Sequence, residues 1–270
     1  MKIPKKIHQI AIQGKSFLSD DIRSSIEGLR NRNPTWEYEL YAEPDILDYI
    51  VNFYGEDYKN LYLKINPQYM AAKADFFRYL LIYNEGGVYL DLKSTCLYPF
   101  DEVIDQNSSF IICAWDNLIG EEHEGFGRHA ELNMLEHGEF IQWCIIAEPK
   151  NIFIKNIIDD IVFNINNYTP WTYGVGGRGV LKTTGPIPFS LSIIRTLRYF
   201  DNFDEFGCVF VRNFKSLGLR YISSDRNEHF SNKDHYSNKL APIVMLNGRL
   251  YFLSTIYTLL VRIRRLFKRR

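Results

Sequence analysis

Apolar positions in the first half of the chain follow two periods that alternate. Short apolar runs typical of β-strands are separated by longer stretches in which apolar residues recur every three or four positions, as on one face of a helix. We expect strands over residues 7–12, 38–41 and around Tyr89, and helices over residues 20–30, 45–53 and 66–83. Such alternation predicts an α/β fold in which helices flank a mainly parallel central sheet.

The last of these helices and the strand after it have clear boundary signals. Asn66 is a good N-cap, and Pro67 suits the first helical position. Gly86-Gly87 then ends the helix. In the segment that follows, alternate residues share a face, as they do in a strand. One face carries Val88, Leu90 and Leu92, and the other carries Tyr89, Asp91 and Lys93.

Charged residues of this helix and this strand are expected to meet. Asp75 and Arg78 are three positions apart, so they share one face of the helix. Ligands of α/β sheets bind beyond the carboxyl ends of the strands. If the helix packs back along the strand, the pair lies near Asp91 at such a site.

The second half of the chain is read as a strand over residues 110–115, an amphipathic helix over residues 153–163 and a Gly-rich loop over residues 164–184. Within that loop the segment 174–179 fits the letters G-x-G-x-x-G. A dinucleotide-binding fingerprint must follow a strand and open a helix, whereas this segment follows Thr169-Pro170-Trp171. We therefore expect a loop, either plain or acting as a flexible lid over the ligand site.

The charged residues around Asp91 form an ordered motif. It consists of Asp75, Arg78 and Tyr79 on the helix, then Gly86, Gly87, Tyr89 and Asp91. This motif resembles the centre of family 32 glycosyltransferases, which include yeast initiation-type mannosyltransferases, and of the related clostridial glucosylating toxins. Where that family has a second Asp, this chain has Lys93.

Further segments extend the resemblance to about residue 186. Residues 3–10 resemble the family's opening strand, and residues 33–38 resemble the entry to its second strand. Gln142-Trp143 and residues 148–151 resemble a later helix and its Pro-containing turn. Thr184-Gly185-Pro186 matches the Thr-Gly-Pro signature.

The resemblance implies a GT-A type nucleotide-sugar transferase fold and transfer that retains the anomeric configuration. A divalent cation, usually Mn²⁺, would bind through the Asp-x-Asp motif and stabilise the leaving diphosphate. Asp91 would contact the ribose and the metal or its water, Arg78 the phosphates or the donor sugar, and Asp75 the sugar hydroxyls. The expected catalytic residues are Asp91, Arg78 and Lys93, and the expected donor-binding residues are Asp75, Tyr89, Gly87, His8 and Gln9.

Lys93 stands where the family has a direct metal ligand, and an ammonium group cannot bind a cation. Three outcomes are open: Asp91 holds the metal with other groups, the Lys93 charge itself neutralises diphosphate, or the site is inactive. Relatives close a His- or Asn/Ser-containing segment over the metal. Residues 234–238 lie roughly at that place, so the candidates are His229, His235 and Ser237, with an ordinary surface position as the alternative for both histidines.

Composition narrows the possible partners and the compartment. Lys plus Arg and Asp plus Glu both number 32, so net charge gives no reason to expect binding to nucleic acid. The four cysteines form no C-x-x-C pair, which favours free thiols in a reducing compartment. No signal peptide is expected at the N-terminus, and this favours a cytoplasmic protein.

The C-terminal segment is apolar and then basic. Residues 250–261 are apolar with small polar breaks, and residues 262–270 carry six Arg or Lys. A bilayer span needs about 20 apolar residues, so we expect a helix in the interface of an anionic membrane. The alternative is a last core helix with a solvated basic end. We expect residues 1–247 to form the catalytic domain and residues 248–270 the membrane-interface segment.

Two classes of function remain. The first is a retaining glycosyltransferase that acts on a glycan or lipid-linked acceptor in surface polysaccharide or glycoconjugate synthesis, peripherally bound to the inner face of a membrane. The second is a non-catalytic glycosyltransferase-like module that binds nucleotide or partner proteins. Lys93 favours the second class, and the joint presence of Asp75, Arg78, Tyr89 and Asp91 favours the first. A phosphohydrolase is a more distant option.

Overall fold

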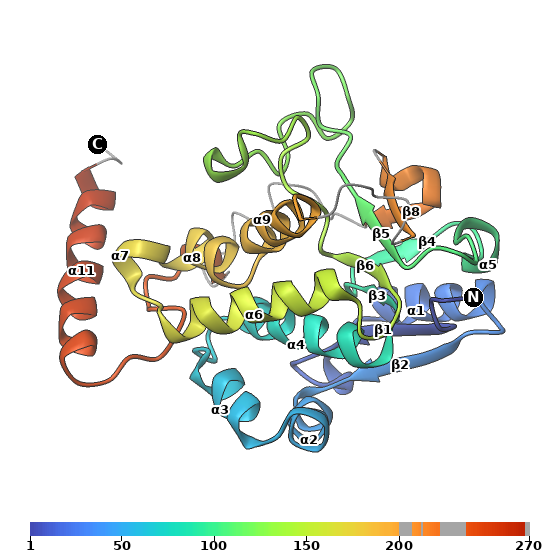
Figure 1. Ribbon diagram of the computed structural model, residues 1–270. Helices are drawn as coiled ribbons and strands as arrows, with labels where there is room; N and C mark the ends of the chain where they lie inside the picture. Colours follow the sequence, from blue (N-terminus) through green and yellow to red (C-terminus); the bar gives the residue numbers. More distant parts are fainter. Residues whose placement is uncertain (200–206, 212, 222–235, 268–270) are drawn as a thin grey trace.

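The computed structural model describes residues 1–199, 207–211, 213–221 and 236–267 of the 270-residue chain. At its centre is a six-stranded sheet (Figure 1). Its strands in spatial order are β2 (Glu37–Tyr41), β1 (Lys6–Ile10), β3 (Gly87–Leu90), β6 (Cys144–Ala147), β5 (Phe110–Cys113) and β7 (Cys208–Val211). The pairs β1/β2, β1/β3 and β5/β7 are parallel, whereas β6 runs antiparallel to β3 and β5. The mainly parallel α/β sheet predicted from the sequence is confirmed.

Helices cover both faces of the sheet, because the inner strands β3, β6 and β5 bury their side chains on both sides. On one face, Tyr89, Phe110 and Ile145 pack with the larger set of helices. These are α2 (Glu43–Tyr54), α3 (Glu56–Lys64), α4 (Met70–Glu85), α6 (Ile152–Asn166), α8 (Gly176–Thr183) and α9 (Pro186–Leu197). On the other face, Val88 and Leu90 pack with α1 (Asp20–Arg32), α5 (Phe100–Val103) and the turn Phe214–Leu217. The predicted alternation of Val88 and Leu90 against Tyr89 is therefore observed.

Two boundaries around the central helix differ from the prediction. α4 begins at Met70 with Tyr69 as N-cap, not at Asn66. The Asn66 side chain instead accepts the Gln68 N–H at 3.0 Å and donates to the Pro242 carbonyl at 3.0 Å, which closes a turn before the helix. β3 ends at Leu90, because the Asp91 carbonyl accepts the Ser94 N–H at 2.9 Å and so opens a turn.

A second, two-stranded sheet continues from this turn. β4 (Ser94–Cys96) pairs antiparallel with β8 (Leu219–Tyr221), with Ser94 opposite Tyr221. Residues far apart in the sequence thus meet beside Asp91.

The prediction of a Gly-rich loop over residues 164–184 is wrong, since α7 (Pro170–Tyr173) and α8 occupy most of this range. Glycines serve close packing here: a Cβ on Gly176 would lie 2.6 Å from the Lys239 carbonyl oxygen. Residues 174–179, which fit the letters G-x-G-x-x-G, lead into α8, but they follow α7 and not a strand. This segment is therefore not a dinucleotide fingerprint.

The expectation of a helix at Gln142-Trp143 is also wrong. These residues lead directly into β6, whose run Cys144-Ile145-Ile146-Ala147 is buried between β3 and β5. The Pro-containing turn after it is present, and Asn151 caps α6 by accepting the Phe153 N–H at 3.0 Å.

The C-terminal segment forms α11 (Gly248–Phe267). Its start coincides with the proposed boundary at residue 247, and the independence of residues 1–247 stays a prediction. Among the described residues, none of the helices combines the length and the apolar character that crossing a membrane requires.

Candidate functional site

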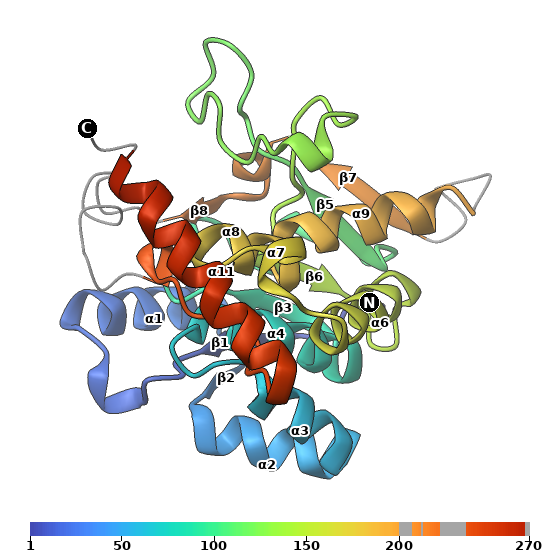
Figure 2. The ribbon, with the colours of Figure 1, turned by 90° about the vertical axis from the view of Figure 1, so that its left-hand side faces the viewer.

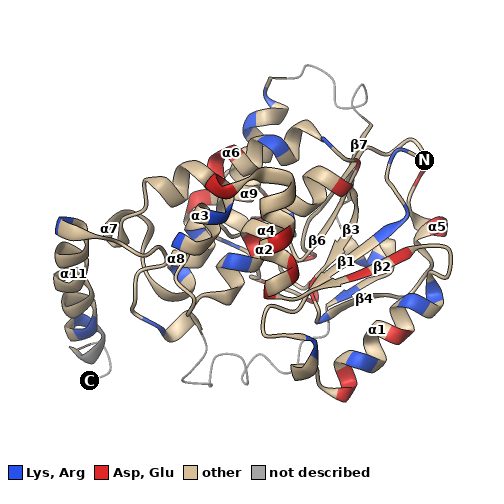
Figure 3. Ribbon diagram, turned by 90° about the horizontal axis from the view of Figure 1, so that it is seen from below, with Lys and Arg blue, Asp and Glu red and all other residues tan. Residues whose placement is uncertain are grey.

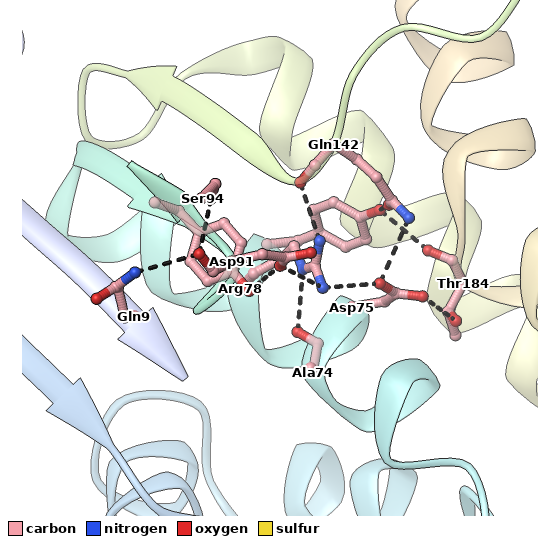
Figure 4. Close-up of polar contacts among 10 residues, drawn as sticks. Gln9, Ala74, Asp75, Arg78, Asp91, Ser94, Gln142 and Thr184 are labelled. Carbon is pink, nitrogen blue, oxygen red and sulfur yellow. Dashed lines mark hydrogen bonds and ion pairs between the residues drawn. The ribbon is translucent and has the colours of Figure 1, made fainter. Parts of the chain in front are cut away.

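The predicted meeting of α4 with the end of β3 is observed. Arg78 Nη2 lies 3.0 Å from Asp75 Oδ1 and 3.2 Å from Asp91 Oδ1 (Figure 4). Asp75 and Arg78 come from one face of α4, and Asp91 is the first residue after β3. The Asp75 and Arg78 side chains are 4% and 5% exposed, whereas Asp91 is 29% exposed. The cluster thus presents one carboxylate outward and buries the other.

The guanidinium of Arg78 has further contacts besides the two carboxylates. Its Nη1 donates to the Gln142 carbonyl at 2.9 Å, and its guanidinium lies 4.7 Å from the centre of the Tyr89 ring. Burial opposes the charged form, but the neighbouring Asp91, Tyr89 and Asp75 outweigh it and raise the pKa of Arg78. Arg78 is therefore a fixed positive charge.

Asp75 is a buried carboxylate with an unusual pKa. Burial raises the pKa of Asp75 to about 6, although Arg78 and a hydrogen bond from Thr184 act in the opposite direction. Thr184 Oγ1 donates to Asp75 Oδ2 at 2.9 Å, and Gln142 Nε2 donates to Oδ1 at 3.4 Å. Asp75 thus titrates near neutral pH, and its ionised form depends on these partners.

We expect Thr184→Val to shift this titration. Without the Thr184 donor, the carboxylate loses a hydrogen bond worth about 1.5 kcal/mol, so the pKa of Asp75 rises by about one unit. The acidic limb of the pH profile of donor binding should then move to higher pH by about one unit. Thr184→Ser keeps the hydroxyl and is the matched control.

The raised pKa of Asp75 also determines how the stability of the fold depends on pH. The pKa of Asp75 is higher in the folded chain than in the unfolded chain, so this group favours folding most below about pH 4. Its contribution falls as the pH rises through about 6.

The Thr184→Val prediction has a clear contrary outcome. If the acidic limb of the pH profile of donor binding stays in place in Thr184→Val, Asp75 does not govern donor binding.

Asp91 is positioned through both its side chain and its main chain. Tyr89 donates its hydroxyl to Asp91 Oδ1 at 2.6 Å, and Gln9 Nε2 donates to the Asp91 carbonyl at 3.1 Å. Tyr38 in turn donates to Gln9 Oε1 at 2.8 Å. Gln9 and Tyr89, both predicted as donor-binding residues, therefore hold the turn that carries Asp91.

His8 and Gly87 lie at the junction between α4 and β3. His8 is buried, its Nε2 is 3.1 Å from the Gly86 carbonyl, and burial lowers the pKa of His8 to about 4. Gly87 has φ 93°, and a Cβ there would lie 2.5 Å from the Lys6 carbonyl oxygen. Both residues shape the backbone that leads to Asp91, and direct contact of either with a donor stays a prediction.

Sequence reasoning missed several residues that complete the cluster. The Tyr79 hydroxyl is within hydrogen-bond distance of the Gln142 side chain and the Thr184 carbonyl. Gln142 and Thr184 fall in segments that resemble the family, which was the available signal, although no role was assigned to either. Tyr236 begins the segment Tyr236–Asn238, which packs against α8. Burial, together with the charges of Asp75 and Asp91, raises the pKa of Tyr236 to about 12.

A metal ion would be held at Asp91, the carboxylate that the cluster presents outward. No group of three or more His, Cys, Asp and Glu side chains able to hold an ion occurs in the described parts of the chain. Asp91 is the partly exposed carboxylate, and half-buried Lys93 follows it in the same turn. Ser237 is in the turn Tyr236–Asn238, whereas His229 and His235 lie outside the described residues.

The chain is similar in sequence to several known glycosyltransferases. Residues 19–110 match the family described as "Glycosyltransferase sugar-binding region containing DXD motif". The chain is 34% identical over 94 residues to an uncharacterized glycosyltransferase of Acanthamoeba polyphaga mimivirus, covering 35% of this chain and 37% of that protein. It is 32% identical over 188 residues to the initiation-specific alpha-1,6-mannosyltransferase of Saccharomyces cerevisiae, covering 59% of this chain and 39% of that protein.

A third relative is the inositol phosphoceramide mannosyltransferase 1 of Schizosaccharomyces pombe, with 27% identity over 41% of this chain and 34% of that protein. Thus the chain spans about two fifths or less of the length of these curated relatives. Among solved structures, the ligand-free glycosyltransferase domain of the YGT toxin aligns with TM-score 0.49 and 10% identity, over 95% of this chain and 90% of that one. The PaToxG glycosyltransferase aligns with TM-score 0.44 and 17% identity, over 90% and 89%.

The sequence matches confirm the resemblance to the sugar-binding DXD glycosyltransferases. Residues 19–110, which match that family's sugar-binding region, include α4, β3 and Asp91. The mixed α/β sheet with Asp91 in the turn after β3 agrees with the GT-A type fold expected from the sequence.

Proposed function

We propose that the chain is a retaining glycosyltransferase that moves a sugar from a nucleotide diphosphate sugar to a glycan or lipid-linked acceptor. The observation that carries the proposal is the Asp75–Arg78–Asp91 cluster, which lies in the family-matched region and exposes one carboxylate at the end of β3. We further propose that the acceptor belongs to surface polysaccharide or glycoconjugate synthesis, and that the enzyme works on the cytoplasmic side of a membrane.

The roles of the cluster follow from its burial. Asp91 can accept hydrogen bonds from hydroxyl groups of the donor, since it is the exposed member. Asp75 fixes Arg78, and Thr184 and Gln142 already donate hydrogen bonds to the Asp75 carboxylate oxygens. Contact of Asp75 with the sugar hydroxyls stays a prediction. Preorganised charge of this kind stabilises a transition state without reorganisation cost. No residue is nominated as a general base.

The direct test is a screen of nucleotide sugars for binding and hydrolysis, with and without Mn²⁺. Two of the relatives are named mannosyltransferases, so a nucleotide diphosphate mannose is the first donor to test. Hydrolysis or transfer that depends on Asp91 supports the proposal. Binding without turnover of any donor supports the non-catalytic module, which Lys93 favours.

We also propose that Asp91 would help to hold a divalent cation, and that Lys93 supplies part of the charge that the diphosphate requires. The position of Lys93, two residues after Asp91 in the same turn, supports this division of roles. When bound, the cation would neutralise charge on the leaving diphosphate.

Lys93 variants test that division. We expect the wild-type chain to keep more activity under chelation than Asp-x-Asp relatives do. Lys93→Asp should be more metal-dependent, because two adjacent carboxylates repel the diphosphate unless a cation lies between them. Lys93→Ala should weaken donor binding by about tenfold in metal-free buffer, since a nearby charge contributes of the order of 1 to 4 kcal/mol.

The measurement is a titration of donor affinity and turnover against Mn²⁺ for the three chains. Complete loss of wild-type activity with chelator, together with unchanged donor binding by Lys93→Ala, would refute a role for the lysine. Groups such as His235 or Ser237 would then be the next candidates for holding the cation.

A further inference from the structure

α11 lies along one side of the molecule, where it packs against α7 (Figures 1 and 2). Trp171 of α7 meets Tyr257 of α11 edge-on, with ring centroids 6.5 Å apart. Ser254 is buried, and Thr258 Oγ1 lies 3.4 Å from the Leu240 carbonyl oxygen. The face of α11 that meets the body of the protein is therefore partly polar.

The opposite face of α11 is apolar and exposed. Phe252, Ile256, Leu259 and Ile263 are four, three and four positions apart, so they line one stripe of the helix, which we call the outer stripe. Their exposed fractions are 65%, 43%, 57% and 41%. A surface helix of a soluble domain normally turns such a stripe toward the core. In α11 this orientation is reversed.

Further exposed apolar side chains widen the outer stripe. They are Leu253, Leu260 and Phe267 on α11. Trp171 on the neighbouring α7 is also partly exposed, beside Tyr257. Aromatic rings with an apolar body and a polar edge favour the boundary between lipid and water. An apolar surface of this size on one helix marks an interaction site.

Charge on α11 has a single sign. Arg249, Arg262 and Arg264 are exposed, and residues 248–270 contain no Asp or Glu. Figure 3 shows blue and no red along α11. A partner that covers this helix must therefore tolerate or supply negative charge.

We propose that the outer stripe of α11 inserts into the surface of an anionic lipid bilayer, with Arg262 and Arg264 on the headgroups. Two observations favour lipid over a second copy of this chain. The apolar face is wider than a two-residue coiled-coil seam, and α11 has no acidic residue to pair with the arginines of another copy. An anionic bilayer satisfies both features, because acyl chains accept apolar residues and headgroups accept arginine.

This inference specifies the membrane partner of the proposed function, but its test does not require activity. The full chain is mixed with phosphatidylcholine vesicles, with or without phosphatidylglycerol, and the bound fraction is measured by flotation. We expect binding to the anionic vesicles, weakened by added salt. The outer-stripe variant combines Phe252→Ser, Ile256→Ser and Leu259→Ser. This variant should bind the anionic vesicles more weakly than the wild-type chain does, by about a hundredfold or more. Arg262→Gln with Arg264→Gln should reduce binding by about thirtyfold.

A matched control replaces equally exposed apolar residues elsewhere. Phe53→Ser, Ile119→Ser and Phe163→Ser combined remove side chains that are 56%, 94% and 62% exposed and lie outside α11. This control should bind vesicles as the wild-type chain does. Melting temperatures of all variants are measured, and a preserved melting temperature of the outer-stripe variant supports loss of a surface and not of the fold.

Three results would overturn the proposal. One is vesicle binding that the outer-stripe variant retains, and another is equal binding to neutral vesicles. The third is a dimer in analytical ultracentrifugation that the outer-stripe variant abolishes, without vesicle binding by the wild-type chain, which would identify a second copy as the occupant. Donor hydrolysis in vesicle-free buffer, measured on the same proteins, separates failure of this surface from failure of the transferase.

Discussion

Asp91→Asn is expected to reduce donor turnover by at least about a hundredfold while the protein stays folded. Asp91 is the exposed carboxylate of the cluster, and loss of one preorganised charged contact to the reacting substrate typically costs about 3 kcal/mol of transition-state stabilisation. Arg78 keeps its buried partner Asp75 at 3.0 Å in this variant. The free energy of unfolding should therefore fall by about 2 kcal/mol or less.

The measurement is steady-state donor hydrolysis together with thermal unfolding of the same preparation. Asp159→Asn is the matched control, since Asp159 is an exposed carboxylate on α6 that pairs with Lys155 at 2.6 Å. This control should keep full activity. Wild-type turnover in Asp91→Asn would refute the assignment of Asp91 to the site.

Arg78→Ala is expected to lower the free energy of unfolding by about 3 to 5 kcal/mol, in addition to abolishing turnover. From the sequence alone we expect this change to leave the fold intact, because rigid elements place Arg78 and Asp91 at one charged cluster. In the structure Arg78 is buried between Asp75 and Asp91, and removal of one partner leaves a buried charge uncompensated. Loss of activity in Arg78→Ala would therefore not separate catalysis from folding.

Two companion variants make that separation. Asp75→Asn combined with Arg78→Met removes both buried charges, so its stability loss should be smaller than the sum of the two single losses. Arg78→Lys keeps the charge but loses the forked geometry, so it should stay folded and turn over donor slowly. Chemical denaturation gives each free energy, and additive losses would show that the Asp75–Arg78 pair is not coupled.

The central convergence could be predicted from the sequence because local signals define it. Three-residue spacing places Asp75 and Arg78 on one face of a helix, the glycine pair ends that helix, and period-two alternation orients the strand before Asp91. The same signals gave α1, β2, α2 and the mainly parallel sheet. Where a polar side chain had two possible partners, local reasoning failed: Asn66 closes a turn with Gln68 and does not cap α4.

The glycines of residues 174–179 show why composition alone was insufficient. Glycine favours a loop, but the same residue also permits close contact between backbones. Gly176 and Gly179 fit against residues 237–243, and this packing makes α8 a helix where a loop was expected. The decisive neighbour is about sixty residues away in the sequence, so no local signal could identify it.

By itself, then, the sequence determined the α/β class, the family resemblance and the approach of Asp75 and Arg78 to Asp91, since each depends on spacing within a few turns of chain. Only the tertiary structure decided which distant groups complete the cluster, namely Gln142 and Thr184, and how deeply it buries Asp75. It also decided the direction of the α11 stripe. Periodicity shows that a helix has an apolar face, but the side on which the rest of the protein packs determines whether that face is covered or left to a partner.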